Sequence, residues 1–235
     1  TIAICSPFCT DNETSFNKRY SLFTDMAFWP KAVPQAELAR QGFKGNKLYQ
    51  YDGFKEDIYV ADYHSDDNFS RSLPFEHYVI VRPENLQANY INNDSAKPIT
   101  PKLLQELSKA GYNILYLPRY AVDKAYAEGV KNIYVPDKPI NGLDACFFSD
   151  AVLTGAGTFA REAACLGVPS FSFFAGKSLL AVDKAFIRDG KMFFSREVSE
   201  LMARLKTSDR TDVDLNRSKA VQEEVISKLK EVIEA

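Results

Sequence analysis

The sequence contains few of the side chains that bind transition metals. Only two histidines, His64 and His77, occur among its 235 residues, which argues against a histidine-rich metal site. Its four cysteines include no C-x-x-C pair, and two of them lie inside apolar segments. We therefore expect no metal and no other cofactor, and we expect buried, reduced thiols of the kind found in cytoplasmic proteins.

The sequence also lacks an excess of either charge and any long apolar run. Lys and Arg number 29 against 31 for Asp and Glu, a net charge of −2, whereas a general nucleic-acid-binding protein is usually basic. No apolar run approaches the roughly 20 residues that span a bilayer. The hydrophobic fraction of 46% and the charged fraction of 26% are those of a soluble globular protein. We expect neither a nucleic-acid partner nor a transmembrane segment.

An initiator methionine is absent as well. The chain opens directly on TIAICSP, which is typical of a buried strand. A chain that begins inside a strand predicts a fragment whose upstream sequence is missing. The alternative is a genuine first strand from which the methionine was removed.

Residues 1–61 are expected to be the remainder of an N-terminal α/β domain. The strands predicted there are Ile2–Cys5, DMAFWP (25–30) and NKLYQYDG (46–53), and the short helices are Ser15–Thr24 and Pro34–Arg40. Residues 62–75 are polar and rich in turn formers, which indicates a linker.

Residues 76–208 alternate strands with helices of about ten residues. The apolar runs VIV (79–81), ILYL (114–117) and FSFF (171–174) are nearly continuous, as expected of strands that are covered on both faces. This alternation predicts an α/β fold with a doubly wound, Rossmann-like parallel sheet. Residues 209–235 carry a C-terminal amphipathic helix, from Arg217 to Glu234.

DAVLTGAGTFAREAACLGVP (150–169) is typical of a strand, a glycine turn and a helix. Ligands bind beyond the carboxyl ends of strands in an open parallel sheet, so we expect a site at Gly155, Ala156, Gly157 and Thr158. Glycines allow close approach of the backbone and positive φ, and the first amides of a helix favour a phosphate. Thr158 can cap the helix, and Glu162, one turn later, can accept hydrogen bonds from a ribose diol.

Two other interpretations of this loop stay open. The first is a plain tight turn in which Thr158 and Glu162 form a partial cap. The second is a fingerprint for a nicotinamide or flavin dinucleotide, but that motif belongs to the first strand–helix–strand unit and needs an acid about 20 residues on. Here the loop follows the fourth strand, and the next strand ends FSFFAGKS, without an acid.

TGAGTFAREAACLGVP resembles the nucleotide-diphosphate loop of GT-B-type sugar-nucleotide enzymes. It looks like UDP-N-acetylglucosamine 2-epimerase, with its D-S-G-G-x-x-E-E-A-x-x-L-G-x-P motif. It is more similar still to a family of unknown function (number 354) of predicted glycosyltransferase-like proteins, whose run is close to G-A-G-G-T-M-A-R-E-A-A-L-L-G-V-P. The present chain is one glycine shorter.

The resemblance extends along most of the chain. YVIVRPEN (78–85) resembles that family's strand ending in V-R-P-E and stands where the epimerases carry H-R-R-E-N, with Val81 in place of the histidine. TDNETSFNKRYSLFTDMAFWPKAVP (10–34) echoes a pattern from the middle of the family's N-terminal domain. The resemblance thus implies that the first part of that domain is absent.

Further candidate residues follow strand ends. Arg82 and Arg119 can each pair with a diphosphate, the alternative being a structural ion pair, for Arg82 with Glu84 or Asp94. Glu84 is a third ligand candidate beside Arg82. Arg161, on the helix after the loop, either reaches phosphate or is solvated. In the N-terminal part, Asp11 and Glu13 follow a strand end and are catalytic acid–base candidates, the alternative being helix capping.

The resemblance implies a GT-B-like protein that binds a nucleotide-diphosphate sugar, such as a UDP-sugar, and transfers glycosyl groups in surface polysaccharide or glycolipid synthesis. The alternatives are a non-enzymatic sugar-nucleotide-binding or scaffold protein and an isomerase similar to UDP-N-acetylglucosamine 2-epimerase. Val81 argues against simple transfer of the epimerase chemistry. The base, the sugar, the acceptor and the oligomeric state stay open, a homodimer included.

Overall fold

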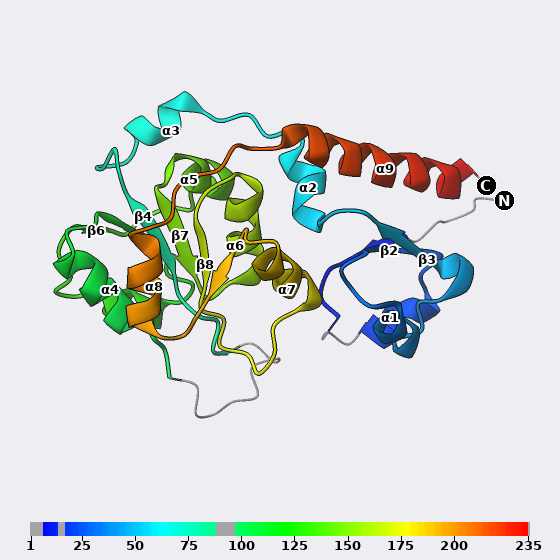
Figure 1. Cartoon of the computed structure of the whole chain (residues 1–235), viewed down its shortest axis with the longest axis horizontal. Helices are drawn as coiled ribbons and strands as arrows, with labels where there is room; N and C mark the ends of the chain where they lie inside the picture. Colours follow the sequence, from blue (N-terminus) through cyan, green and yellow to red (C-terminus); the bar gives the residue numbers. More distant parts are fainter. Residues whose placement is uncertain (1–6, 14–16, 88–96, 235) are drawn as a thin grey trace. The chain divides into compact units, whose positions relative to one another are not determined.

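The structure, a computed structural model, describes residues 7–13, 17–87 and 97–234, and it forms two compact units (Figure 1). Unit 1 comprises residues 1–62, 180–185 and 214–235, and unit 2 comprises residues 63–179 and 186–213. The predicted first strand, Ile2–Cys5, lies outside the described residues.

Unit 1 contains a parallel three-stranded sheet in the order β1-β2-β3. Its strands are β1 (Pro7–Cys9), β2 (Met26–Pro30) and β3 (Leu48–Tyr51). Its helical segments are the 3-10 helices η1 (Asn17–Leu22) and η2 (Gly45–Lys47) and the α-helices α1 (Gln35–Arg40), α2 (Lys55–Val60) and α9 (Leu215–Glu234). The predicted strands DMAFWP and NKLYQYDG are thus confirmed, and the first predicted helix is a 3-10 helix.

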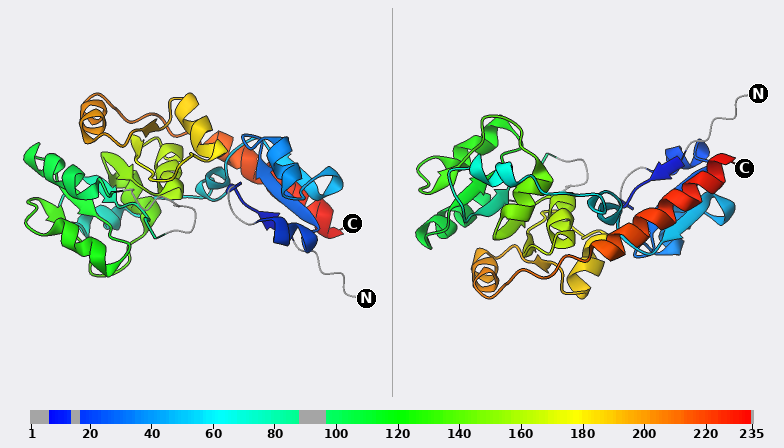
Figure 2. Two further views of the ribbon diagram at one scale, coloured as in Figure 1. Left: turned by 90° about the horizontal axis from the view of Figure 1, so that it is seen from below. Right: turned by 90° about the horizontal axis from the view of Figure 1, so that it is seen from above.

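Helix α9 belongs to unit 1 although it ends the chain (Figure 2). Val221 and Val225 on its apolar face pack against Phe28 and Tyr51 of the sheet. Ser218 Oγ also donates a hydrogen bond to Asp57 Oδ1 of α2, at 2.9 Å. The sequence predicted a separate C-terminal helix, whereas in the structure this helix is part of unit 1. The reason is that an amphipathic helix needs a partner surface against which its apolar face is buried.

Unit 2 is a parallel six-stranded sheet in the order β6-β5-β4-β7-β8-β9. The strands are β4 (Val79–Arg82), β5 (Ile114–Tyr116), β6 (Ile133–Tyr134), β7 (Ala151–Thr154), β8 (Ser170–Ser172) and β9 (Phe193–Phe194). The helices are α3 (Asp67–Arg71), α4 (Thr100–Lys109), α5 (Gly142–Phe148), α6 (Gly157–Cys165) and α8 (Val198–Leu205), with the 3-10 helix η3 at Ala121–Ala127. Helix α7 (Ala181–Arg188) begins in the part assigned to unit 1.

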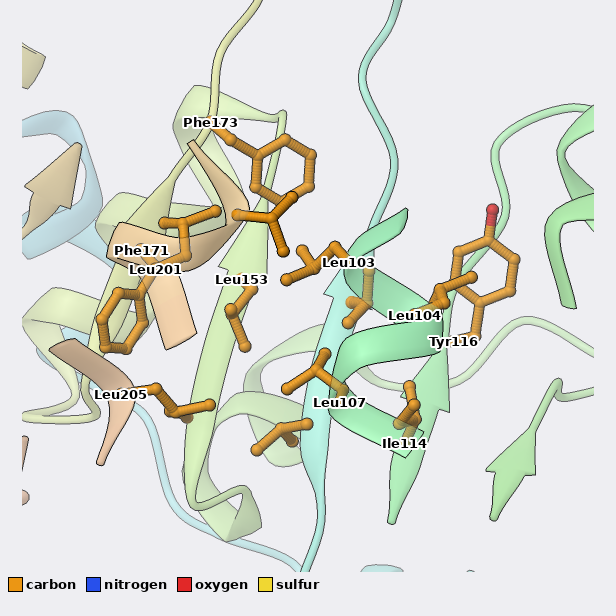
Figure 3. Close-up of a cluster of buried hydrophobic side chains, with 14 residues drawn as sticks. Leu103, Leu104, Leu107, Ile114, Tyr116, Leu153, Phe171, Phe173, Leu201 and Leu205 are labelled. Atoms are coloured by element: carbon orange, nitrogen blue, oxygen red, sulfur yellow. The ribbon is translucent and has the colours of Figure 1, made fainter. Parts of the chain in front are cut away.

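Helices cover both faces of the unit 2 sheet. On one face, Leu103, Leu104 and Leu107 of α4 meet Leu153 and Phe171 (Figure 3), and leucines of α8 complete this core. On the opposite face, Ser170 Oγ of β8 donates a hydrogen bond to the Ala160 carbonyl of α6, at 2.6 Å. The predicted α/β fold with a doubly wound parallel sheet is confirmed.

The segment predicted as a linker, residues 62–75, is an ordered part of unit 2 from Tyr63 onward. Tyr63 donates a hydrogen bond from its hydroxyl to Asp144 Oδ1 of α5, at 2.7 Å. Phe69 of α3 stacks on Phe148 of α5 at 6.2 Å between ring centroids. The segment is polar overall, which is why it resembles a linker, but a few large side chains anchor it to α5.

Two glycines end helices in unit 2 and provide a matched pair for a stability test. Gly167 follows α6 at φ +68°, and a Cβ there would lie 2.2 Å from the Thr211 carbonyl oxygen. Gly111 follows α4 at φ +84° with nothing within 4 Å of such a Cβ. The left-handed conformation alone costs a non-glycine residue about 1–2 kcal/mol.

We expect Gly111→Ala to lower the unfolding free energy by about 1–2 kcal/mol. Gly167→Ala should cost about 3 kcal/mol or more, because the clash with a carbonyl adds to the backbone strain. Urea denaturation of both variants measures the difference. Equal losses would show that the contact with Thr211 is not rigid.

Candidate functional site

The candidate site lies where the strand order of unit 2 reverses. Strands β4 and β7 are neighbours in the sheet but not in the chain, and Arg82 at the end of β4 is paired in register with Thr154 at the end of β7. The connections that follow these strands lead away on either side. Such a switch point leaves a crevice beyond the carboxyl ends of the strands, and ligands of open α/β sheets bind there.

The glycine loop at this point consists of only two residues, Gly155 and Ala156. The Gly155 amide donates a hydrogen bond to the Arg82 carbonyl, at 3.0 Å, and the Ala156 amide donates one to Thr154 Oγ1, at 2.9 Å. Helix α6 then begins at Gly157, and among the described residues no side chain caps its N-terminus. The first-turn amides of α6 are therefore available to an anion.

Thr158 is exposed and lies inside the helix rather than at its cap. The predicted cap by Thr158 is therefore wrong, because the helix starts at Gly157 and Ala156, two residues before Thr158, occupies the N-cap position. The hydroxyl of Thr158 instead accepts a long hydrogen bond from the Arg161 guanidinium, at 3.4 Å.

Gly155 is needed for close packing and not for an unusual backbone conformation. Neither Gly155 nor Gly157 is among the glycines with positive φ, so that part of the prediction is wrong. A Cβ at Gly155 would lie 2.5 Å from Glu84 Cα and 2.8 Å from the Glu84 amide nitrogen. The glycine therefore lets the end of β7 touch the chain that leaves β4.

Glu84 belongs to the interior of unit 2. Its side chain is 1% exposed, and its carboxylate accepts hydrogen bonds from the Ile99 amide at 2.8 Å and the Thr100 hydroxyl at 2.6 Å. Arg196 Nη1 lies 3.5 Å from Glu84 Oε1. These contacts anchor the start of α4 and give the buried carboxylate a structural role, whereas its contact with a ligand stays a prediction.

Arg82 carries an incompletely paired charge at the site. Its guanidinium stacks on the Phe159 ring of α6 at 5.3 Å from the centroid. Its Nε atom is buried, and it has no hydrogen-bond partner within the part of the chain that the structure describes. Of the two ion pairs predicted as the alternative, the one with Glu84 is not formed, because the Glu84 carboxylate is bonded to Ile99 and Thr100, and Asp94 lies outside the described residues.

Arg119 brings a second guanidinium close to the first. Its Nε donates a hydrogen bond to the Pro83 carbonyl, at 3.2 Å. Burial, followed by the charge of Arg119, lowers the pKa of Arg82, and the carboxylate of Glu162 opposes this shift. The site therefore combines two cations and one acid in the arrangement predicted for Arg82, Arg119 and Glu162, whose ligand contacts stay predictions.

Arg161 is 1% exposed, so the solvated alternative for this residue is wrong. It lies on α6 and its guanidinium contacts Thr158. Phe159, whose ring lies under the Arg82 guanidinium, was not predicted as a site residue. The one available signal was its place two residues after Gly157.

The two predicted acid–base residues lie in unit 1. Asp11 is buried and forms an ion pair with Lys55, 3.3 Å between Oδ2 and Nζ. Glu13 Oε1 accepts a hydrogen bond from the Ala181 amide at the start of α7, at 2.6 Å, and burial raises the pKa of its carboxyl. Glu13 thus caps a helix, as one of the two interpretations expected, and a catalytic role for either residue stays a prediction.

The described ranges contain no metal cluster, no paired cysteines and no membrane-spanning helix. No group of three or more His, Cys, Asp or Glu side chains there could hold a metal ion. Cys9, Cys146 and Cys165 are free, and Cys146 is buried as predicted whereas Cys9 is exposed. None of the helices described is both long and apolar enough to cross a membrane.

Comparison with known proteins identifies a family and a fold. A family described as "Protein of unknown function (DUF354)" matches residues 1–233. An uncharacterized protein of Methanocaldococcus jannaschii is 28% identical over 205 residues, which are 83% of this chain and 58% of that protein. The chain thus spans less than two thirds of the length of that relative.

Among solved structures, the UDP-GlcNAc 2-epimerase of Methanocaldococcus jannaschii, crystallised with UDP-GlcNAc and UDP, matches with a TM-score of 0.62 at 15% identity, over 89% of this chain and 62% of the epimerase. The UDP-GlcNAc 2-epimerase of Neisseria meningitidis, bound to UDP-GlcNAc, matches with a TM-score of 0.61 at 14% identity, over 88% of this chain and 62% of the epimerase. The calicheamicin glycosyltransferase CalG4 matches with a TM-score of 0.50 at 15% identity, over 87% of this chain and 49% of CalG4. The chain therefore has a GT-B-like fold, as predicted.

The structural role of Glu84 is tested by Glu84→Gln. The variant loses the charge that faces Arg196 and replaces one acceptor by a donor, so we expect it to lose about 2–3 kcal/mol of unfolding free energy. Urea denaturation measures the loss. The control is Glu106→Gln, which removes an exposed ion pair with Lys109 on the same helix, α4, and should leave the unfolding midpoint nearly unchanged. A midpoint of Glu84→Gln equal to that of the control would contradict the structural role.

Proposed function

We propose, from the premise that the chain belongs to the DUF354 family, that unit 2 binds the diphosphate of a nucleotide sugar at the switch point between β4 and β7. The first-turn amides of α6 and the guanidiniums of Arg82 and Arg119 would hold the two phosphates. Glu162 would accept hydrogen bonds from the ribose.

The observation that carries this proposal is the environment of Arg82. A buried cation is costly unless an anion and hydrogen bonds compensate it. Arg82 is half-buried, its Nε is buried and unbonded within the described segments, and the charge with the largest effect on its pKa is another cation, Arg119. One carboxylate, Glu162, cannot neutralise both arginines. A dianionic ligand supplies the missing charge and bidentate hydrogen-bond acceptors.

Helix α6 adds a second source of positive potential. Helix α6 begins at Gly157, after the two loop residues that follow β7. Its N-terminus lies at the same end of the sheet as Arg82, and no side chain caps it in the described chain. The unpaired amides and the helix dipole together favour a phosphate there. The charge and the donors thus converge on one edge of the sheet.

The type of ligand is supported by the fold neighbours. Two of them are epimerases crystallised with UDP-GlcNAc, one of these also with UDP, and another is a glycosyltransferase. At these identities the neighbours share the fold alone. A UDP-sugar is therefore the first ligand to test.

For the reaction, we favour glycosyl transfer, in surface polysaccharide or glycolipid synthesis, over isomerisation. Fixed cations and amides around a diphosphate stabilise the charge that develops on a departing nucleoside diphosphate. Val81 stands where the epimerases carry a histidine and is fully buried in β4, so that position offers no acid–base group. A non-enzymatic nucleotide-sugar-binding protein is the second candidate, and Val81 suits it equally.

Isothermal titration calorimetry, which measures the affinity for UDP, tests the proposal. Arg82→Met keeps a long, unbranched side chain that can pack on Phe159 but removes the charge and the donors. We expect it to weaken UDP binding by about 10–100-fold, the loss of a charge-assisted hydrogen bond. The control is Arg210→Met, because Arg210 also stacks on a phenylalanine, Phe147, at 5.3 Å but bonds to the Ser149 carbonyl before β7 begins. Equal affinities for the wild type and Arg82→Met would contradict the proposed site.

The role of Glu162 is separated from that of Arg82 by titrating inorganic pyrophosphate beside UDP. Glu162→Ala should weaken UDP but not pyrophosphate, because it removes a ribose contact together with a negative charge near the phosphates. Arg82→Met should weaken both ligands. Turnover of a UDP-sugar by the wild type would exclude the non-enzymatic alternative.

A further inference from the structure

The 3-10 helix η1 and the residue after it expose an unusual group of large apolar side chains. The exposed fractions are 58% for Tyr20, 74% for Leu22 and 79% for Phe23. Elsewhere in the described chain, large exposed apolar side chains do not occur as three within four residues. Scattered exposed apolar residues need no explanation, but a contiguous group indicates an interaction surface.

The local structure turns these side chains outward. The Phe23 amide donates a hydrogen bond to the Tyr20 carbonyl, at 3.0 Å, and Thr24 Oγ1 donates one to the same carbonyl, at 2.7 Å. Ser21 and Thr24 are the buried members of this turn, at 7% and 5% exposure. The usual distribution of polar and apolar side chains is inverted in this turn, since the hydroxyl side chains face inward and the apolar ones face solvent.

Basic residues surround this turn. Lys47 Nζ donates a long hydrogen bond to the Ser21 carbonyl, at 3.4 Å, and a Cβ at Gly42 would lie 2.4 Å from Ser21 Oγ, so residues 42–48 lie against the turn. Arg19 and Lys44 are exposed. Segments 19–24 and 42–48 contain three basic and no acidic residues, although the whole chain has a net charge of −2.

We propose that this surface, which we call the η1 patch (Arg19, Tyr20, Leu22, Phe23, Lys44 and Lys47), docks on an anionic lipid membrane. Apolar tips that insert at the level of the acyl chains, with Lys and Arg at the level of the head groups, are the chemistry of a peripheral membrane contact. An acidic lipid surface complements the local positive charge. The inference stands independently of nucleotide binding, because the patch belongs to unit 1 and the proposed phosphate site to unit 2.

An acidic protein partner would match the charges of the patch, but the apolar side chains argue for lipid. Leu22 and Phe23 are adjacent in the chain and are the two most exposed apolar side chains of the patch, at 74% and 79%. Insertion into a fluid interface needs no complementary shape. A protein partner is therefore an outcome against the proposal in the following test.

The test is co-sedimentation of the chain with vesicles of phosphatidylcholine alone and with vesicles that also contain phosphatidylglycerol. We expect binding to the anionic vesicles and little binding to the neutral ones. The double variant Leu22→Ser/Phe23→Ser should lower the partition coefficient by about tenfold or more. The matched control is Ile226→Ser/Ile233→Ser, which removes two exposed apolar side chains from α9 and should leave partitioning unchanged.

A second variant tests the charges. Lys44→Gln/Lys47→Gln should weaken binding to the anionic vesicles and reduce its dependence on salt. Circular dichroism and thermal unfolding, measured on every variant, verify that each one is folded. No binding to either vesicle, equal binding to both, or equal losses in the patch and control variants would overturn the proposal.

Discussion

The hydrogen bond from the Gly155 amide to the Arg82 carbonyl joins the ends of β4 and β7, and the candidate site depends on this contact. It brings the residue after β7 against the backbone of Glu84, where only glycine fits. It thereby places the start of α6 beside the Arg82 guanidinium. A parallel sheet has many strand ends, but only at its switch point do the flanking connections diverge and leave room for a ligand.

The charged residues near this contact divide into a structural group and an available group. In the structural group, the buried Glu84 carboxylate faces Arg196 and accepts a hydrogen bond from the Thr100 hydroxyl, which stabilises the start of α4. Arg82 and Arg119 form the second group, and among the described residues Glu162 is the carboxylate that opposes the effect of Arg119 on the Arg82 pKa. A site that is arranged for an anion before the anion arrives needs little reorganisation on binding, which is the property that electrostatic catalysis and tight phosphate binding share.

The sequence predicted the fold well because its signals are local. Unbroken apolar runs and helices with a leucine face, such as Leu103, Leu104 and Leu107, identify a covered parallel sheet without knowledge of contacts. The same local signals predict a site at the loop after β7, and ligand binding there stays a prediction. The role of Glu84, the stack of Arg82 on Phe159 and the return of α9 to unit 1 could not be predicted, since each depends on residues far apart in the chain that only the tertiary fold brings together.

The central claim is that the first-turn amides of α6 and the Arg82 guanidinium form one receptor for a diphosphate. A crystal structure of the protein with UDP tests it most directly. We predict phosphate oxygens within about 2.7–3.2 Å of an α6 first-turn amide and of the Arg82 guanidinium. A structure in which UDP binds elsewhere, with the N-terminus of α6 and Arg82 contacting only protein groups, would contradict the account.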